Sequence, residues 1–119
     1  MEAAKKRDID DIANIILEDE IGHTYYPNRS VLVSKLEDAI KQEEIFSYRL
    51  DDQIVGIIWY MENGMFGFYS YLHIIIVREG YKSRGIGLKM MEFLQSKVEE
   101  NNRKLLLKKI FLLVNSDNQ

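Results

Sequence analysis

Apolar residues recur every third or fourth position in three segments of the chain, 9–16, 32–40 and 88–98. This spacing places the apolar side chains on one face of a helix. Asp8 can cap the first helix, which we expect to reach about residue 19, and Asn28 or Ser30 can cap the second, which we expect to reach about residue 42. The third is expected to begin near Gly87 and to end at Asn101–Asn102.

Between the second and third helices the pattern changes to that of strands. Residues 46–50 alternate apolar and polar, Asp51–Asp52–Gln53 interrupts them, and an apolar run follows over 54–60. Asn63–Gly64 then predicts a tight hairpin turn into a third strand over 65–77. Its last part, 72–77, is apolar on both faces, as expected for a strand covered on both sides.

Two further segments complete the predicted order of elements. The stretch 23–28, which contains the single proline, Pro27, reads as a loop. Residues Ile110–Val114 form an uninterrupted apolar run that we interpret as a buried strand. Together these elements predict an α+β fold, a mixed and mostly antiparallel sheet flanked by helices.

Composition narrows the class of protein. A length of 119 residues allows one domain, here taken as 1–119. The net charge of −3 disfavours nucleic-acid binding, and the absence of cysteine together with only two histidines disfavours a metal site. No apolar stretch is long enough for a membrane span or a signal peptide, so we expect no membrane partner and a cytoplasmic location.

The segment that connects the third strand to the third helix contains the residues that indicate a ligand-binding site. Gly85 and Gly87 stand at the start of a helix, where free backbone N–H groups and the helix dipole attract an anion, and Lys82 and Arg84 add positive charge. Two common phosphate loops do not fit, because Ile86 and Gly87 replace the Lys and Ser of a P-loop and Met90 replaces the third glycine of a dinucleotide loop.

Residues 82–87, Lys-Ser-Arg-Gly-Ile-Gly, resemble the acyl-CoA motif of the GCN5-related N-acetyltransferase (GNAT) family. Val77 and Tyr81 before the motif and the apolar helix after it extend the resemblance, which spans nearly the whole chain, from a short strand near residues 3–6 onward. It implies acetyl-CoA as co-substrate, with the backbone of Ile75, Ile76 and Val77 pairing with the pantetheine. The implied pyrophosphate ligands are Lys82, Ser83, Arg84, Gly85, Ile86 and Gly87, and Asn118 matches a further family position.

The sequence departs from the family pattern at two places. Lys82 stands where the family usually has Arg or Gln, which keeps the charge but loses the planar guanidinium. The family continues after its fifth strand with a helix that bears a Tyr general acid and with two more strands, and these elements have no counterpart before Gln119. Either the sequence is a fragment or the active site is completed in another way. If the end is natural, the strand at 110–114 would expose an edge and favour a twofold homodimer.

Tyr71 and His73 are our candidate catalytic residues, because they share strand parity and precede the expected cofactor strand. They can serve as proton acceptor or relay, or they can be packed, hydrogen-bonded side chains. The segment Glu18–Glu20 with the nearby His23, Tyr25 and Tyr26 is either an acidic rim for a cationic amine or a solvated helix end.

The predicted function is transfer of an acetyl group from acetyl-CoA to the primary amine of a small molecule or peptide. A thioester needs no covalent nucleophile on the enzyme, which suits a chain without cysteine. The alternatives are a non-catalytic CoA-binding module and a small interaction domain that pairs through its sheet edge.

Overall fold

The structure, a computed structural model, describes the backbone of residues 1–65 and 69–117 and the side chains of residues 1–62 and 71–105. The strands are β1 (Glu2–Ala3), β2 (Ile45–Leu50), β3 (Gln53–Met65) and β4 (Tyr69–Val77). The helices are the short 3₁₀ helix η1 (Lys6–Asp8), α1 (Ile9–Glu18), α2 (Glu20–Tyr25), α3 (Arg29–Lys41) and α4 (Ile86–Asp117).

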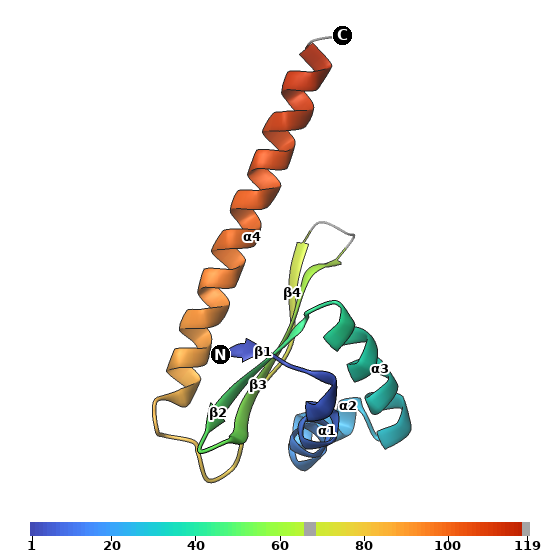
Figure 1. Ribbon diagram of the computed structural model, residues 1–119, viewed down its shortest axis with the longest axis vertical. Helices are drawn as coiled ribbons and strands as arrows, with labels where there is room; N and C mark the ends of the chain where they lie inside the picture. Colours follow the sequence, from blue (N-terminus) through green and yellow to red (C-terminus); the bar gives the residue numbers. More distant parts are fainter. Residues whose placement is uncertain (66–68, 118–119) are drawn as a thin grey trace.

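The four strands form one antiparallel sheet in the order β1-β2-β3-β4. Helices α1, α2 and α3 cover one face of the sheet and α4 crosses the other, as Figure 1 shows. The predicted α+β fold, a mostly antiparallel sheet flanked by helices, is confirmed, and every strand pair in the described part of the chain is antiparallel.

Each face of the sheet has its own hydrophobic core. The first core packs α1 and α3 against side chains of β2, β3 and β4, among them Ile57, Trp59, Ile74 and Ile76. The second packs Ile86, Met90 and Leu94 of α4 against Val55, Ile58 and Tyr60 of β3. Alternate residues of one strand therefore serve opposite layers, which is why residues 54–60 and 72–77 are apolar without interruption.

The segment after α1 was expected to be a loop over residues 23–28, and this prediction is wrong for its first part. Asp19 ends α1 and caps α2, where its carboxylate accepts hydrogen bonds from the N–H groups of Ile21 (3.1 Å) and Gly22 (3.2 Å). A Cβ atom on Gly22 would lie 2.2 Å from the carbonyl oxygen of Ile16. The glycine therefore permits α2 to pack tightly against the end of α1.

The predicted strand Ile110–Val114 is wrong, because α4 continues as a helix from Ile86 to Asp117. Asn101 does not end the helix: it is buried, and its side-chain amide donates a hydrogen bond to the carbonyl of Glu62 in β3 (3.1 Å). No glycine or proline occurs between residues 88 and 117 to stop a helix. The twofold dimer that was expected through an exposed strand at 110–114 thus loses its basis.

The tight turn predicted at Asn63–Gly64 is also wrong. Both residues belong to β3, which extends to Met65, where Met65 pairs with Tyr69 of β4; residues 66–68 lie outside the described residues. The register is irregular between Met61 and Met65, so the added chain length there is absorbed within the strand.

Candidate functional site

The open edge of β4 is the first component of the site. Within the described residues β4 pairs on one side only, with β3. The N–H of Arg78 donates to the carbonyl of Val55 (2.7 Å), so Arg78 and Ile76 direct their backbone groups toward β3. Because successive residues of an antiparallel strand alternate, the N–H and C=O groups of Ile75 and Val77 point to the open edge. An extended ligand can pair there as an added strand.

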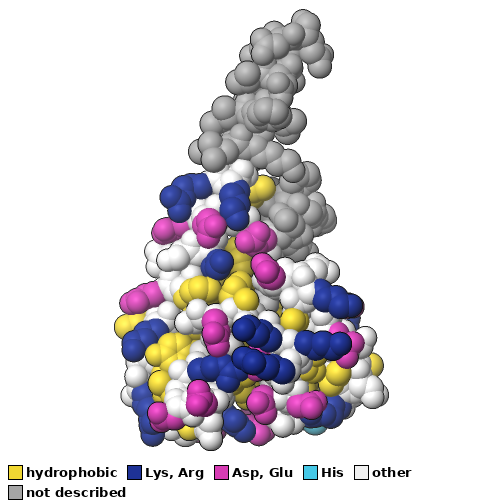
Figure 2. All heavy atoms as spheres, in the orientation of Figure 1, with side chains coloured by type: hydrophobic (Ala, Val, Ile, Leu, Met, Phe, Trp, Pro, Cys, Tyr) yellow, Lys and Arg dark blue, Asp and Glu magenta, His cyan; other side chains and the backbone are white. Residues whose placement is uncertain are grey.

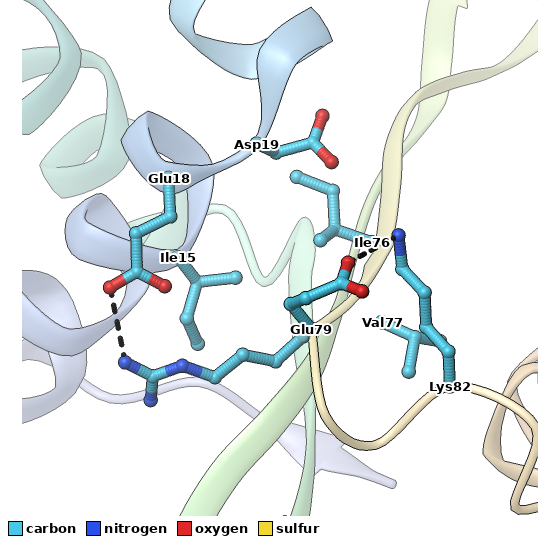
Figure 3. Close-up of a pocket in the computed structure, with 8 residues that line it drawn as sticks. Ile15, Glu18, Asp19, Ile76, Val77, Glu79 and Lys82 are labelled. Carbon is cyan, nitrogen blue, oxygen red and sulfur yellow. Dashed lines mark hydrogen bonds and ion pairs between the residues drawn. The ribbon is translucent and has the colours of Figure 1, made fainter.

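Two hollows lie along this edge. One, of about 210 Å³, is lined by His73 to Ile76 of β4 and by residues Asp19 to Tyr25 at α2. The other, of about 50 Å³, follows toward the carboxyl end of β4. Figure 3 shows this second hollow, with Ile76 and Val77 on one side, Glu18 and Asp19 on another, and Glu79 and Lys82 closing it.

The loop after β4 leads directly into the start of α4. Gly80, Ser83 and Gly85 have positive φ angles of 91°, 68° and 76°, and alternation of such residues with ordinary ones turns successive N–H groups toward one side. Helical hydrogen bonding begins with the N–H of Lys89, which donates to the carbonyl of Gly85 (3.2 Å). The N–H groups of residues 86–88 precede that bond and are therefore available to an anion.

The charged side chains of this loop are held by local partners. The ammonium group of Lys82 lies 3.0 Å from the carboxylate of Glu79, which raises the pKa of Lys82. Arg84 lies over the ring of Tyr81 at 5.1 Å, and Arg78 pairs with Glu18 at 3.2 Å. The first two pairs are at the surface, so both cations can turn toward a bound phosphate at small cost.

A β-bulge at His73 sets the geometry next to the open edge. Trp59 pairs with Ile74 and Tyr60 pairs with Leu72, which leaves His73 as the extra residue of β4. As a result His73 and Ile74, although adjacent in sequence, both face the layer formed by α1 to α3. Ile75 and Val77 face α4 instead.

Aromatic rings surround His73. Tyr26 and Trp59 stack on each other, with ring centroids 5.9 Å apart, and both meet the imidazole edge-on. Tyr25 and Tyr71 complete the enclosure, with centroids 5.3 Å and 5.9 Å from that of His73. Tyr71 and His73, the two candidates chosen from the sequence, are therefore brought together, and they lie on the same face of the sheet.

The hydroxyl of Tyr26 and Nε2 of His73 share a hydrogen bond of 2.5 Å. Nδ1 of the same ring is buried and has no hydrogen-bond partner among the described residues. Burial, together with the charge of Lys35, lowers the pKa of His73, so the imidazole is neutral at pH 7. Burial raises the pKa of Tyr26, so its hydroxyl keeps its proton. A neutral imidazole bonded to a protonated phenol can take up and pass on a proton.

A larger cavity, of about 380 Å³, opens on the other side of His73. Its apolar wall consists of Tyr26, Ala39, Trp59, Met61, Tyr71 and His73, and its polar residues are Lys35, Asp38, Gln42 and Glu44. His73 also lines the 210 Å³ hollow at the edge of β4. The imidazole therefore borders both the groove at the edge of β4 and this cavity.

In this α+β protein an open strand edge leads directly into a helix start with free N–H groups, an arrangement that can hold an extended ligand bearing phosphate. The sequence model of the acetyltransferase (GNAT) family matches residues 9–119. The chain belongs to this family, whose members take acetyl-CoA as acyl donor.

Two solved structures share the fold. A candidate acetyltransferase of Pyrococcus horikoshii is 20% identical, with a TM-score of 0.64, over 83% of this chain and 34% of its own. A predicted acetyltransferase of Clostridium acetobutylicum, solved with acetyl-CoA, is 16% identical, with a TM-score of 0.62, over 83% of this chain and 72% of its own. The present chain thus spans about a third of the length of the first and most of the second. The search of curated proteins gives no match.

The remaining site predictions can be located as follows. Ile75, Ile76 and Val77 lie on β4, Lys82, Ser83, Arg84 and Gly85 lie in the loop, and Ile86 and Gly87 begin α4. Asn118 lies outside the described residues. Tyr26 and Trp59 were not selected from the sequence as partners of His73. The aromatic pair at 25–26 was the available signal for the former, since an acidic rim for the amine was one of the two interpretations of this segment.

Three general features of the described residues bear on possible ligands and surroundings: surface charge, groups that could hold a metal ion, and helix hydropathy. On the face shown in Figure 2, Lys and Arg side chains lie among Asp and Glu side chains. In the described ranges, no group of three or more acidic or histidine side chains is arranged to hold a metal ion. None of the helices in the same part of the chain has the length and hydropathy needed to cross a bilayer.

Proposed function

We propose that this protein transfers the acetyl group of acetyl-CoA to the nitrogen of a primary amine, and that residues 1–119 form one domain for this reaction. The observation that carries the proposal is the position of His73. It lines both the groove at the edge of β4 and the 380 Å³ cavity, so one side chain can reach the junction of a donor and an acceptor.

The donor would lie along the edge of β4. The outward backbone groups of Ile75 and Val77 can pair with the amides of a pantetheine chain. The diphosphate would then reach the loop at 82–87, where the first N–H groups of α4 converge. Lys82 and Arg84 would leave their present surface partners to neutralise its charge.

The chain's own residues would orient the amine and accept its proton. The amine nitrogen attacks the thioester carbonyl, the new C–N bond forms, the C–S bond breaks, and CoA leaves as its thiolate, which can later take up the proton that the nitrogen lost. The proton lost by the nitrogen would pass to the Tyr26 hydroxyl as the phenol gives its own proton to Nε2 of His73. Tyr71, which lines the same cavity, would position the acceptor.

Purified protein tests this proposal with acetyl-CoA and a panel of small primary amines and peptides, by following thiol release and the mass of the acetylated product. We expect His73→Gln to lower kcat about 100-fold, and Tyr26→Phe about 10-fold or more, while the melting shift caused by acetyl-CoA is kept. Tyr48→Phe is the matched control, since it removes the same hydroxyl group from a side chain that lines neither the groove nor the cavity. Thiol release that stays within a few-fold of the parent in both variants would overturn the assigned proton route.

A further inference from the structure

A further cavity, of about 390 Å³, lies on the α4 side of the sheet, and His73 is not part of its lining. It is bordered by the connection from α3 to β2, by β3 and by α4. Three of its lining residues are glutamates, Glu43, Glu44 and Glu62, and two are lysines, Lys97 and Lys104. None of these side chains takes part in the proposed proton route, so a ligand bound here would be a second one.

Charges of opposite sign line this cavity without meeting. Within the described part of the chain, neither lysine pairs with a glutamate of the cavity, and Lys104 pairs instead with Glu100, at 3.4 Å. The ammonium group of Lys97 lies over two rings, 5.0 Å from the centre of Phe46 and 5.6 Å from that of Phe93. The rings hold this cation but do not neutralise it. The cavity therefore has a positive pole on α4 and a separate negative pole formed by glutamates.

The backbone of Glu43 supports a role for its side chain. Its N–H donates to the carbonyl of Ile40 (3.1 Å), and the N–H of Glu44 donates to the carbonyl of Ala39 (3.0 Å). These two bonds form a Schellman motif, which ends α3 with Glu43 at a φ of 55°. Glycine is the favoured residue at this position, because other residues are strained there. A charged residue thus stands where glycine would stabilise the helix end, and it lines the cavity.

We propose that this cavity is a second binding site, for a small zwitterion that carries an ammonium group and a carboxylate, as an amino acid or a dipeptide does. The carboxylate would bind the ammonium group of Lys97, and the ammonium group would bind the glutamates across the cavity. A ligand with a single charge would leave one pole unpaired. In the described residues the glutamates are not grouped to hold a metal ion, which is consistent with an organic cation.

The cavity adjoins the one beside His73, because Gln42 and Glu44 line both. A carboxylate oxygen of Glu44 accepts a hydrogen bond from the indole N–H of Trp59, at 3.4 Å. Trp59 in turn meets the imidazole of His73 edge-on. A zwitterion that attracts the Glu44 carboxylate would change the surroundings of Trp59, so the proposed site is coupled to the cavity beside His73.

Three ligands of nearly the same shape test the requirement for two charges. N,N-dimethylglycine is a zwitterion whose tertiary amine cannot form a stable amide, isovalerate keeps only its carboxylate, and N,N-dimethylisobutylamine keeps only its ammonium group. In calorimetric titrations we expect the zwitterion to bind about 5-fold or more tightly than either of the others. N,N-dimethylglycylglycine separates the same charges by a peptide unit, so its affinity distinguishes an amino acid from a dipeptide. Equal affinity of both zwitterions and a singly charged ligand would overturn the proposal.

Matched variants assign the binding to this cavity. Lys97→Met keeps an apolar side chain over the two rings and should reduce the affinity of the zwitterion to that of the amine. Lys89→Met makes the same change on an exposed part of α4 outside the cavity lining and should have no effect. Glu43→Gly should weaken binding about 5-fold and yet raise the melting temperature by about 3 °C, because it relieves the positive φ. Unchanged affinity in both Lys97→Met and Glu43→Gly would place the zwitterion elsewhere and refute the site.

The fluorescence of Trp59, the single tryptophan of the chain, tests the coupling. We expect it to change along the same binding curve that calorimetry gives for N,N-dimethylglycine, and to stay constant in Lys97→Met. Constant fluorescence in the parent at saturation would refute the coupling to the cavity beside His73. None of these measurements requires acetyl transfer, so their outcome is independent of the proposed function.

Discussion

Substitution of Gly87 by Glu tests the proposed diphosphate site most directly. Gly87 is the second residue of α4, where backbone N–H groups have no helical partner. A Cβ atom at this position would meet Val77 Cγ2 at 3.8 Å, which is ordinary contact. The unliganded protein should therefore accept a side chain here without loss of stability, and Gly87→Ala should be neutral or slightly stabilising because alanine favours helix.

The expected loss of binding follows from charge. A carboxylate about 4 Å from a phosphate costs roughly 1 kcal/mol in water and about 4 kcal/mol at the effective dielectric constant near a protein surface. The upper value corresponds to about a 1,000-fold loss of affinity. In the parent, acetyl-CoA at about 100 times its dissociation constant adds about 2.7 kcal/mol to the free energy of unfolding, or a melting shift on the order of 10 °C.

Thermal unfolding with and without acetyl-CoA measures the melting shift, and the loss of affinity follows from it. Gly87→Gln separates bulk from charge, and Met91→Glu places the same charge one turn along α4 on an exposed residue. We expect the shift to vanish in Gly87→Glu, to be reduced in Gly87→Gln and to be kept in Met91→Glu. A full shift in Gly87→Glu would refute the reasoning and place the cofactor elsewhere.

Three further predictions concern charge, packing and pH. Glu79→Gln releases the ammonium group of Lys82 and should raise acetyl-CoA affinity by up to about 5-fold at low salt; a titration in which affinity falls would contradict this. Gly22→Ala should lower the melting temperature by on the order of 10 °C, because its Cβ atom would lie 2.2 Å from a carbonyl oxygen; unchanged calorimetry would mean that α2 can separate from α1. Because the pKa of His73 is lowered from 6.5, the unfolded chain binds this proton first as pH falls. Its contribution to stability is complete above pH 6.5 and is lost below it, so His73→Asn should flatten the pH dependence of unfolding in that range, and an identical pH profile would count against the burial of this side chain.

The layers of the fold could be predicted from the sequence because each rests on local periodicity. The spacing of four residues between Leu32 and Leu36 predicted α3, and both residues are fully buried. The predictions failed where a local signal competed with a longer-range contact. Asn63–Gly64 is a strong turn signal, yet both residues pair within β3. An apolar run such as 110–114 suits a strand and a helix equally, and the absence of a helix stop before it decided the outcome.

The two halves of the site differ in how far sequence can predict them, for a physical reason. The proposed anion site at 82–87 would act through its backbone, so the required glycines and flanking cations can be recognised directly in the sequence. The proposed proton relay of His73 and Tyr26 would act through side chains 47 positions apart, which meet because a bulge turns His73 onto the face that α2 covers. A bulge leaves no mark in the types of residue along the strand. If β4 had kept its alternation through residue 73, His73 would face the same side of the sheet as Ile75. The imidazole would then lie against α4, away from both cavities. The hydrophobic pattern of a strand that is apolar on both faces does not fix its pairing register with the neighbouring strand. That register nevertheless decides whether this histidine can reach a substrate.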